Sequence, residues 1–253
     1  NAERMQTTWY DTIATLGWIA GITQHVRLLS HVFVVPYRHP LLTSKAFSTL
    51  DELSGGRAIL GVGAGHVEGE FDVLGVDFGN RGALTDEAVD AIRIAFGEEY
   101  PEFHGETWNA EGDAGARPRP RQEHLPIWIG GSSKPALRRA ATRGDGWLPQ
   151  GTPRDQMPGD IAYLMEHREA AGKADDPIDI GTIAMPYYVG EPDWDVGPYT
   201  VSGSAEQHVE SLLDVHGIGV NHVQVRFRNR SLNELLDQMD AFAEEVMPHL
   251  PNP

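Results

Sequence analysis

Residues that could take part in catalysis or ligand binding follow apolar runs that are typical of β-strands. One run leads into Gly61-Val-Gly-Ala-Gly65 and then His66, whose imidazole can give or accept a proton near neutral pH. The alternate glycines could let a flat ligand approach the backbone, Ala64 and Gly65 included, but a tight strand-to-helix turn explains them equally well. The spacing is not the dinucleotide fingerprint, because His66 and Glu68 stand where the third glycine would fall.

A second candidate site is the segment Gly130, Gly131, Ser132 and Ser133, which follows the apolar run 126–129. It opens an expected helix and offers free backbone N–H groups, two hydroxyls and the positive end of a helix dipole. A simple capped helix start is the alternative. We favour phosphate binding, because glycines precede two hydroxyl residues directly after an apolar strand.

Gln150 and Arg226 fall at or near the ends of later expected strands and could orient a polar substrate. Arg226 could equally pair with one of the many carboxylates. His39, His104 and His222 lack the spacing of a metal site, and the chain has no cysteine to supply thiolate ligands. We therefore expect no metal.

These residues need a scaffold that brings strand ends together, and the stretch 26–70 indicates one. An apolar, β-branched run at 26–35 ends at Pro36, and Pro40 suits the first turn of a helix. Within that helix Leu42, Ala46, Leu50 and Leu53 recur at helical spacing, and Gly55 and Gly56 end it before the run 58–62. Such a strand-helix-strand unit crosses over right-handedly, and chemistry in such folds sits at the carboxyl ends of the strands.

The rest of the chain continues the alternation. We expect strands at 26–35, 58–62, 126–129, 146–149, 178–189 and 222–227, with helices between them. The helix at 84–96 is amphipathic, and Ser204-Ala-Glu-Gln207 forms a capping box. Six strands fit an open sheet, or an eight-stranded barrel that lacks its first one or two units.

Residues 97–125 are polar and rich in Gly, Pro and Arg, which is typical of a long loop, a lid or a linker. The run Arg117-Pro-Arg-Pro-Arg121 could attract an anionic ligand tail, although a solvated linker is the favoured interpretation. No repeat or second domain is evident, so we expect residues 1–253 to form a single domain.

The amino-acid composition limits the classes of molecule that the protein can bind. Twenty Lys plus Arg against 37 Asp plus Glu give a net charge of −17, which repels nucleic acid and anionic membranes. No apolar run approaches the roughly 20 residues of a membrane span, and no signal peptide is visible. The lack of cysteine is compatible with a reducing cytoplasm. We expect a cytoplasmic protein with a small-molecule substrate.

Several motifs together resemble the luciferase-like monooxygenase superfamily, and most of all its oxidoreductases that depend on coenzyme F420, an 8-hydroxy-5-deazaflavin. They are Pro36-Tyr-Arg-His-Pro40, Leu53-Ser-Gly-Gly-Arg57, Gly61-Val-Gly-Ala-Gly65 with Glu70-Phe71, Asn80-Arg-Gly with Thr85-Asp86-Glu87, Pro126-Ile-Trp-Ile-Gly-Gly131 and Gly144-Asp-Gly-Trp-Leu-Pro149. The resemblance runs from about Tyr10 to Pro248, and the order of the motifs is more specific than any single one.

The resemblance implies an α/β fold, the (β/α)8 TIM barrel of the luciferase-like type, usually a homodimer, with the cofactor ring at the carboxyl ends of the strands. Members begin with a strand and helix before the equivalent of Tyr10, so we expect one or two N-terminal units to be missing from this chain, which starts at Asn1. His31-Val32 would hold a non-prolyl cis peptide that backs the ring, and the segment 130–133 matches the phosphate-binding turn. His66 stands where a related sugar-phosphate dehydrogenase carries a glutamate acid.

The resulting hypothesis is hydride transfer between the deazaflavin and a small organic substrate, with His66 as acid or base. The close rival is a monooxygenase of the same superfamily that uses flavin mononucleotide (FMN). A rival of another class is a non-catalytic protein that binds and carries the deazaflavin or flavin. A hydrolase on a barrel is disfavoured, because no nucleophile-base motif is present.

Overall fold

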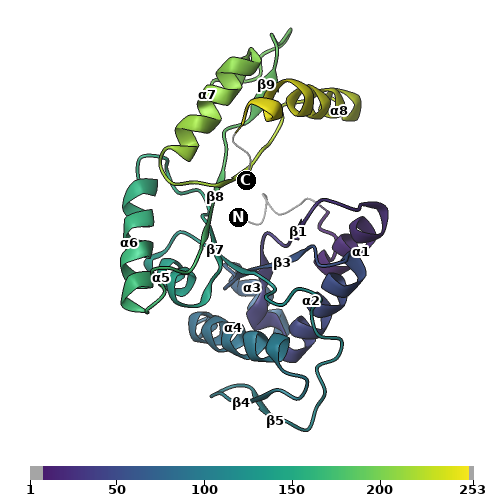
Figure 1. Ribbon diagram of the computed structural model, residues 1–253, viewed down its shortest axis with the longest axis vertical. Helices are drawn as coiled ribbons and strands as arrows, with labels where there is room; N and C mark the ends of the chain where they lie inside the picture. Colours follow the sequence, from purple (N-terminus) through teal and green to yellow (C-terminus); the bar gives the residue numbers. More distant parts are fainter. Residues whose placement is uncertain (1–7, 251–253) are drawn as a thin grey trace.

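The structure, a computed structural model, describes residues 8–250 and is built around a curled parallel sheet (Figure 1). The strand order is β1-β3-β6-β7-β8-β11, and β2 also pairs with β3. These strands are β1 (Leu28–Leu29), β2 (Phe33–Val34), β3 (Ala58–Gly63), β6 (Ile127–Gly130), β7 (Gly146–Leu148), β8 (Asp179–Ile183) and β11 (His222–Gln224). Because β1 and β2 pair with opposite ends of β3, they are two halves of one strand, and a strand lies at each of the six predicted positions. The prediction of one strand at 178–189 was wrong in its extent, because β8 ends at Ile183 and residues 187–189 belong to a separate two-stranded sheet.

The sheet is open. Within residues 8–250 no strand pairs with the outer edge of β1 or of β11, so the described strands form an open sheet, as six strand positions allowed. Six strand positions curl only part of the way round, whereas a closed (β/α)8 barrel needs eight. The described fold is therefore an α/β half-barrel.

The helices before α7 lie along the outer side of the sheet, and α7 and α8 pack on β9 (Tyr187–Val189) and β10 (Val201–Gly203) instead. The helices are α1 (Thr12–Ile22), α2 (Pro40–Ser54), the short α3 (Glu68–Leu74), α4 (Arg81–Gly97), α5 (Lys134–Arg143), α6 (Met157–Ala170), α7 (Ala205–His216) and α8 (Leu232–Ala241). Several predicted caps are confirmed: Pro40 lies in the first turn of α2, Gly55 is its C-cap, and Ser204 and Gln207 form the capping box of α7. None of the described helices combines the length and hydropathy that a membrane span requires.

The buried apolar residues form one large core and a smaller second one. The large core lies between the sheet and helices α2, α4 and α5, and contains Phe47, Leu60, Ile92 and Trp147. The second core lies in an upper unit made of β9 (Tyr187–Val189), β10 (Val201–Gly203), α7 and α8 (Figure 1). This upper unit continues from the carboxyl ends of β8 and β11, so it stands beside the rim where a ligand would bind.

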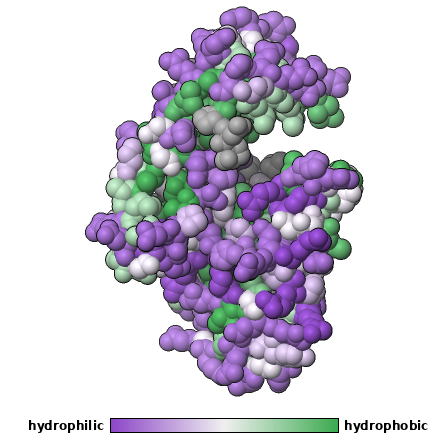
Figure 2. Space-filling view, in the orientation of Figure 1, coloured by the Kyte–Doolittle hydropathy of each residue, from purple (hydrophilic) through white to green (hydrophobic). Residues whose placement is uncertain are grey.

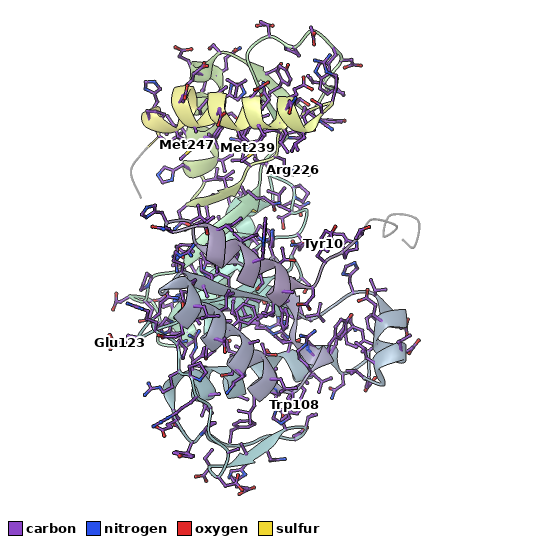
Figure 3. The ribbon with its side chains drawn as sticks, turned by 90° about the vertical axis from the view of Figure 1, so that its right-hand side faces the viewer. Tyr10, Trp108, Glu123, Arg226, Met239 and Met247 are labelled. Carbon is purple, nitrogen blue, oxygen red and sulfur yellow. The ribbon has the colours of Figure 1, made fainter. Side chains whose placement is uncertain are left out.

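The open side of the sheet is flanked by α1 and α8, and both helices expose apolar side chains there. On α8 these are Leu232, Leu236 and Met239, and on α1 they are Trp18 and Ile22. A notch separates the two regions in the space-filling view (Figure 2), and Met239 is labelled on α8 in Figure 3.

The apolar residues that recur at helical spacing in α2 do not all lie on its buried face. Leu42 and Leu53 are 63% and 75% exposed, whereas Ser44, Ser48 and Asp51 are buried. The helix packs between α1 and α4, and small side chains let neighbouring helices approach closely. Of the three leucines at this spacing only Leu50, 3% exposed, is buried, so the spacing did not identify the buried face.

The polar segment 97–125 is partly structured. Its hairpin, β4 (Glu102–His104) and β5 (Asn109–Glu111), packs on the outer side of α4, where the Glu87 carboxylate accepts the N–H groups of Thr107 and Trp108. Trp108 is labelled in Figure 3. The remainder is an extended connection into β6. The segment thus lies outside the helical layer and does not cover the carboxyl ends of the strands.

Arg57, from the Gly-Gly-Arg motif, holds the start of the sheet to two helix ends. Its guanidinium donates to the carbonyl oxygens of Ala20, Thr23, Val26 and Ser54, and to the Thr23 hydroxyl. The first and last of these carbonyls lie near the carboxyl ends of α1 and α2, where a cation is electrostatically favoured.

We predict that Arg57→Met lowers the free energy of unfolding by more than about 3 kcal/mol, because several buried carbonyl groups lose their donor at once. The measurement is urea unfolding followed by circular dichroism. The matched control is Arg119→Met, since Arg119 is exposed. Equal unfolding midpoints for the two variants would show that Arg57 does not hold these segments together.

Candidate active site

Strand β1 and strand β2 are separated by a bulge at residues 30–32, and its His31–Val32 peptide bond is cis, as the resemblance implied. The Ser30 hydroxyl donates to the Gly61 carbonyl at 2.9 Å and accepts the Gly61 N–H at 3.0 Å. A Cβ atom on Gly61 would lie 1.9 Å from the Ser30 carbonyl oxygen. Gly61 therefore makes room for the bulge.

Val32 fixes the bulge against two more glycines. A Cβ on Gly63 would lie 2.5 Å from Val32 Cγ2, and one on Gly130 would lie 2.7 Å from Val32 Cγ1. The space over Gly61 and Gly63 is thus filled by the protein itself and not left for a flat ligand. The turn interpretation holds for Gly65, which has φ +82° and lies over the ring of Phe71.

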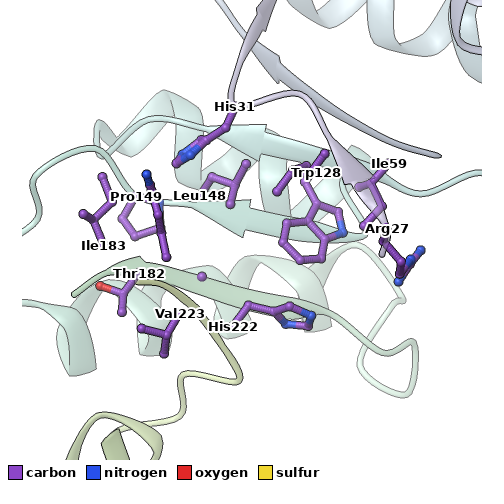
Figure 4. Close-up of a pocket in the computed structure, with 13 residues that line it drawn as sticks. Arg27, His31, Ile59, Trp128, Leu148, Pro149, Thr182, Ile183, His222 and Val223 are labelled. Atoms are coloured by element: carbon purple, nitrogen blue, oxygen red, sulfur yellow. The ribbon is translucent and has the colours of Figure 1, made fainter. Parts of the chain in front are cut away.

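The concave face of the sheet holds a pocket of about 320 Å³ (Figure 4). Its walls are largely apolar and include Leu29, Ile59, Trp128 and Leu148. Arg27 and His222 lie at the amino ends of their strands, while His31, Thr182 and Gln224 lie toward the carboxyl ends. No acidic side chain of residues 8–250 lines it, so the pocket suits a small, mainly apolar ligand with a polar group.

His31 projects into the pocket from the bulge (Figure 4). The side-chain nitrogen of Gln150 lies 3.2 Å from His31 Nε2, which brings two predicted site residues together. Burial lowers the pKa of the His31 imidazole, and the neighbouring Gln224 side chain offsets this in part. The imidazole is therefore neutral at pH 7.

The predicted anion site is the turn between β6 and α5. The Gly131 N–H donates to the Leu148 carbonyl, and the Ser133 hydroxyl caps α5 by accepting the Ala136 N–H at 3.3 Å. The backbone N–H groups of Ser132 and Ser133 have no hydrogen-bond acceptor within residues 8–250. The first turn of α5 carries no acidic residue, so this turn can receive an anion.

Ser132 also joins this turn to Gln150. Its hydroxyl accepts the Gln150 N–H at 2.8 Å and the Thr152 hydroxyl at 2.6 Å. The predicted Gly130–Ser133 turn, Gln150 and His31 therefore form one connected cluster along the carboxyl ends of β6, β7 and β1.

The structure does not bring His66 or Arg226 into this cluster. His66 is exposed, does not line the pocket, and makes no hydrogen bond or ion pair with the described residues. Arg226 is also exposed and donates to the Ala184 carbonyl at 2.9 Å, not to a carboxylate (Figure 3). Ala64 and Gly65 are half-buried at the carboxyl end of β3.

Other titratable groups near this rim have structural partners. Tyr37 donates to the Glu70 carboxylate at 2.5 Å, and burial, reinforced by that carboxylate, raises the pKa of the Tyr37 phenol.

In residues 8–250 no three His, Asp or Glu side chains are grouped so as to hold a metal ion. The polar side chains toward the carboxyl end of the pocket are His31, Thr182 and Gln224, and Gln150 contacts His31 from outside the lining. Sequence reasoning missed Gln224 because nothing local marks it.

The sequence is similar to one family model and to several known proteins. Residues 2–197 match the family model described as luciferase-like monooxygenase. An uncharacterised protein of Mycobacterium tuberculosis is 34% identical over 245 residues, covering 94% of this chain and 77% of that protein. The F420-dependent glucose-6-phosphate dehydrogenase of Kineococcus radiotolerans is 35% identical over 175 residues, covering 67% of this chain and 51% of that enzyme.

Among solved structures, an F420-dependent secondary alcohol dehydrogenase in complex with an F420-acetone adduct has a similar fold. The TM-score is 0.83 at 19% sequence identity, and the match covers 98% of this chain and 86% of that one. At this identity the similarity concerns the fold alone.

We predict that Gly63→Ala displaces the bulge, because the new methyl group would overlap Val32, and that the imidazole of His31 moves with it. The displacement is measured as a change in the His31 nuclear magnetic resonance (NMR) signals and a loss of about 1 to 3 kcal/mol in unfolding free energy. Gly69→Ala is the control, since nothing lies within 4 Å of its Cβ position. Unchanged His31 signals in Gly63→Ala would contradict the packing described for Val32.

Proposed function

The chain belongs to the luciferase-like monooxygenase family, and on that premise we propose that it is an oxidoreductase that transfers a hydride between coenzyme F420 and a small organic substrate. The observation that carries the proposal is the bulge at 30–32, which is seated on Gly63 and Gly130 directly beside the anion-binding turn. The choice of F420 is supported by the 35% identity to the F420-dependent glucose-6-phosphate dehydrogenase.

The residues present fit a phosphate-bearing deazaflavin. The free N–H groups of Ser132 and Ser133, with the positive end of α5, would hold a phosphate group. His31 and Val32 would stand behind the ring, with Ala64 and Gly65 at the neighbouring strand end. When bound, the deazaflavin supplies the carbon atom that gives or receives the hydride.

The chain's own residues would hold and orient the substrate. The apolar walls of the pocket would surround its carbon skeleton and exclude water. Gln150, which lies outside the pocket lining but contacts His31, would orient its polar group. The roles predicted for His66 and Arg226 stay predictions, because both side chains lie outside the pocket. The homodimer and the cytoplasmic location likewise stay predictions.

Titration of the purified protein with oxidised F420 and, separately, with FMN tests the proposal. Micromolar binding of F420 with weak binding of FMN, followed by absorbance and fluorescence, is the expected result. A preference for FMN would favour the rival flavin monooxygenase. Tight F420 binding without turnover of any acceptor would favour a carrier protein, and binding of neither would overturn the cofactor assignment.

We predict that Ser133→Ala weakens F420 binding about fivefold. The Ser133 hydroxyl accepts the Ala136 N–H and can donate its own proton to the phosphate, and a hydrogen bond to a charged group contributes about 1 kcal/mol or more. Binding of 8-hydroxy-5-deazariboflavin, which lacks the phosphate, should not change. Ser204→Ala is the matched control, since it removes an N-cap hydroxyl from α7. Equal weakening for both ligands would show that Ser133 acts only on the stability of α5.

A further inference from the structure

The amino end of the concave pocket presents two hydrogen-bond donors that have no acceptor within residues 8–250. We propose that this end is a carboxylate-binding subsite, formed by Arg27 and the indole N–H of Trp128, and that the ligand of the pocket is a small carboxylic acid with an apolar body. The subsite lies at the opposite ends of the strands from the anion-binding turn. The inference therefore goes beyond the proposed function, and it holds whether or not F420 binds.

Trp128 carries the first of these donors. Its side chain is 2% exposed, and its Nε1–H has no hydrogen-bond partner among the described residues. The neighbouring buried indole, that of Trp147, donates its Nε1–H to the Gly131 carbonyl at 2.8 Å. A buried donor without an acceptor destabilises a fold, so a ligand that brings an acceptor to Trp128 Nε1 removes an existing penalty.

Packing fixes the orientation of this indole. A Cβ atom on Gly146 would lie 2.6 Å from Trp128 Cγ, so the ring fills the space over Gly146. His222 packs edge-on against the indole, with ring centroids 4.7 Å apart and an angle of 80° between the planes. The His222 ring is held in turn, because its Nδ1 lies 3.0 Å from Asn221 Oδ1. The indole therefore keeps its N–H at the amino end of the pocket.

Arg27 supplies the second donor and a positive charge. It lines the same end of the pocket, and the indole nitrogen of Trp128 is on the side of the ring that faces Arg27 (Figure 4). The Arg27 side chain is exposed and makes no hydrogen bond or ion pair with residues 8–250, so its guanidinium can shift to admit an oxygen atom beside the indole. A carboxylate fits both donors, because each of its two oxygens can accept one of them.

The charge of the lining favours an anion. Apart from two histidines, Arg27 is the one ionisable side chain among the described residues that line the pocket. Asp179 lies 3.6 Å from His222 Nδ1 but is not part of the lining. An acid that enters this pocket therefore meets a cation without a competing carboxylate, in a chain whose net charge is −17.

The walls beyond the subsite determine the rest of the ligand. Leu29, Ile59 and Leu148 are apolar, so they suit a hydrocarbon body next to the carboxylate. Trp128 precedes Gly130, the last residue of β6, by two positions, which is roughly 7 Å along a strand. One carbon ring spans that interval. Its far side then points toward His31 at the carboxyl ends of the strands.

The test uses cyclohexanecarboxylate as the probe and cyclohexanecarboxamide as its neutral counterpart of the same shape. Both are titrated calorimetrically into the purified protein without F420, and the indole N–H signals are followed by NMR, with that of Trp128 assigned from Trp128→Phe. We expect the acid to bind at least tenfold more tightly than the amide and to shift the Trp128 signal. The Trp147 signal should stay in place, because that N–H already donates to Gly131.

Arg27→Met should weaken binding of the acid at least tenfold and change the Kd of the amide less than twofold, since only the acid is charged. Arg119→Met is the control and should change neither. Equal affinity for acid and amide, or a Trp128 signal that the acid does not move, overturns the inference on the unsubstituted protein alone. Full affinity for the acid in Arg27→Met also overturns it.

A second experiment, on the protein saturated with F420, distinguishes a substrate acid from an effector acid. If 4-hydroxycyclohexanecarboxylate is a substrate, its carbinol hydrogen leaves as a hydride to oxidised F420, its hydroxyl proton goes to solvent, and the keto acid and reduced F420 are formed. Binding without reduction of F420 identifies an effector, and the subsite stands in both cases. Acid binding without F420 binding overturns the proposed function alone, and F420 binding without acid binding overturns this inference alone.

Discussion

The packing of Val32 between Gly63 and Gly130 is the constraint on which the candidate site depends. It holds the bulge between three neighbouring strand positions, and the hydroxyl of Ser30 ties the same bulge to Gly61. A bulge redirects the side chains beside it, and here it aims His31 into the concave face of the sheet. Gly61, Gly63 and Gly130 therefore help to position the imidazole of His31.

The motifs that identify the family mainly build the scaffold, and only those at 126–131 and 144–149 also line the pocket, through Trp128, Leu148 and Pro149. Asp145, of the Gly-Asp-Gly-Trp motif, accepts from Arg93 at 2.6 Å and from the Ile127 N–H at 2.8 Å. Burial would raise its pKa, but Arg93 and these hydrogen bonds prevail and hold it below its ordinary value. Asp86 binds the buried Arg139 and so joins α4 to α5. Family membership thus follows from the framework, while the pocket is lined by residues outside these ion pairs.

Local signals in the sequence predicted the elements well and their surroundings less well. The strand positions, the caps at Pro40 and Ser204, and the turn at Gly130 follow from residues close together in the chain. The exposed face of α2 and the partners of His31 do not. Leu42 and Leu53 are exposed because helices on both sides select small residues, and Gln150 lies 119 residues from His31. Those outcomes depend on tertiary packing, which periodicity alone does not contain.

The hydroxyl of Ser132 joins the two halves of the site. It lies in the turn suited to a phosphate group and accepts hydrogen bonds from the Gln150 N–H and the Thr152 hydroxyl. A ligand in the turn and a ligand beside His31 would therefore share one hydrogen-bonded element. Any change in affinity that the first ligand passed to the second through Ser132 would be matched by an equal change in the affinity of the first, because linkage of binding free energies is reciprocal.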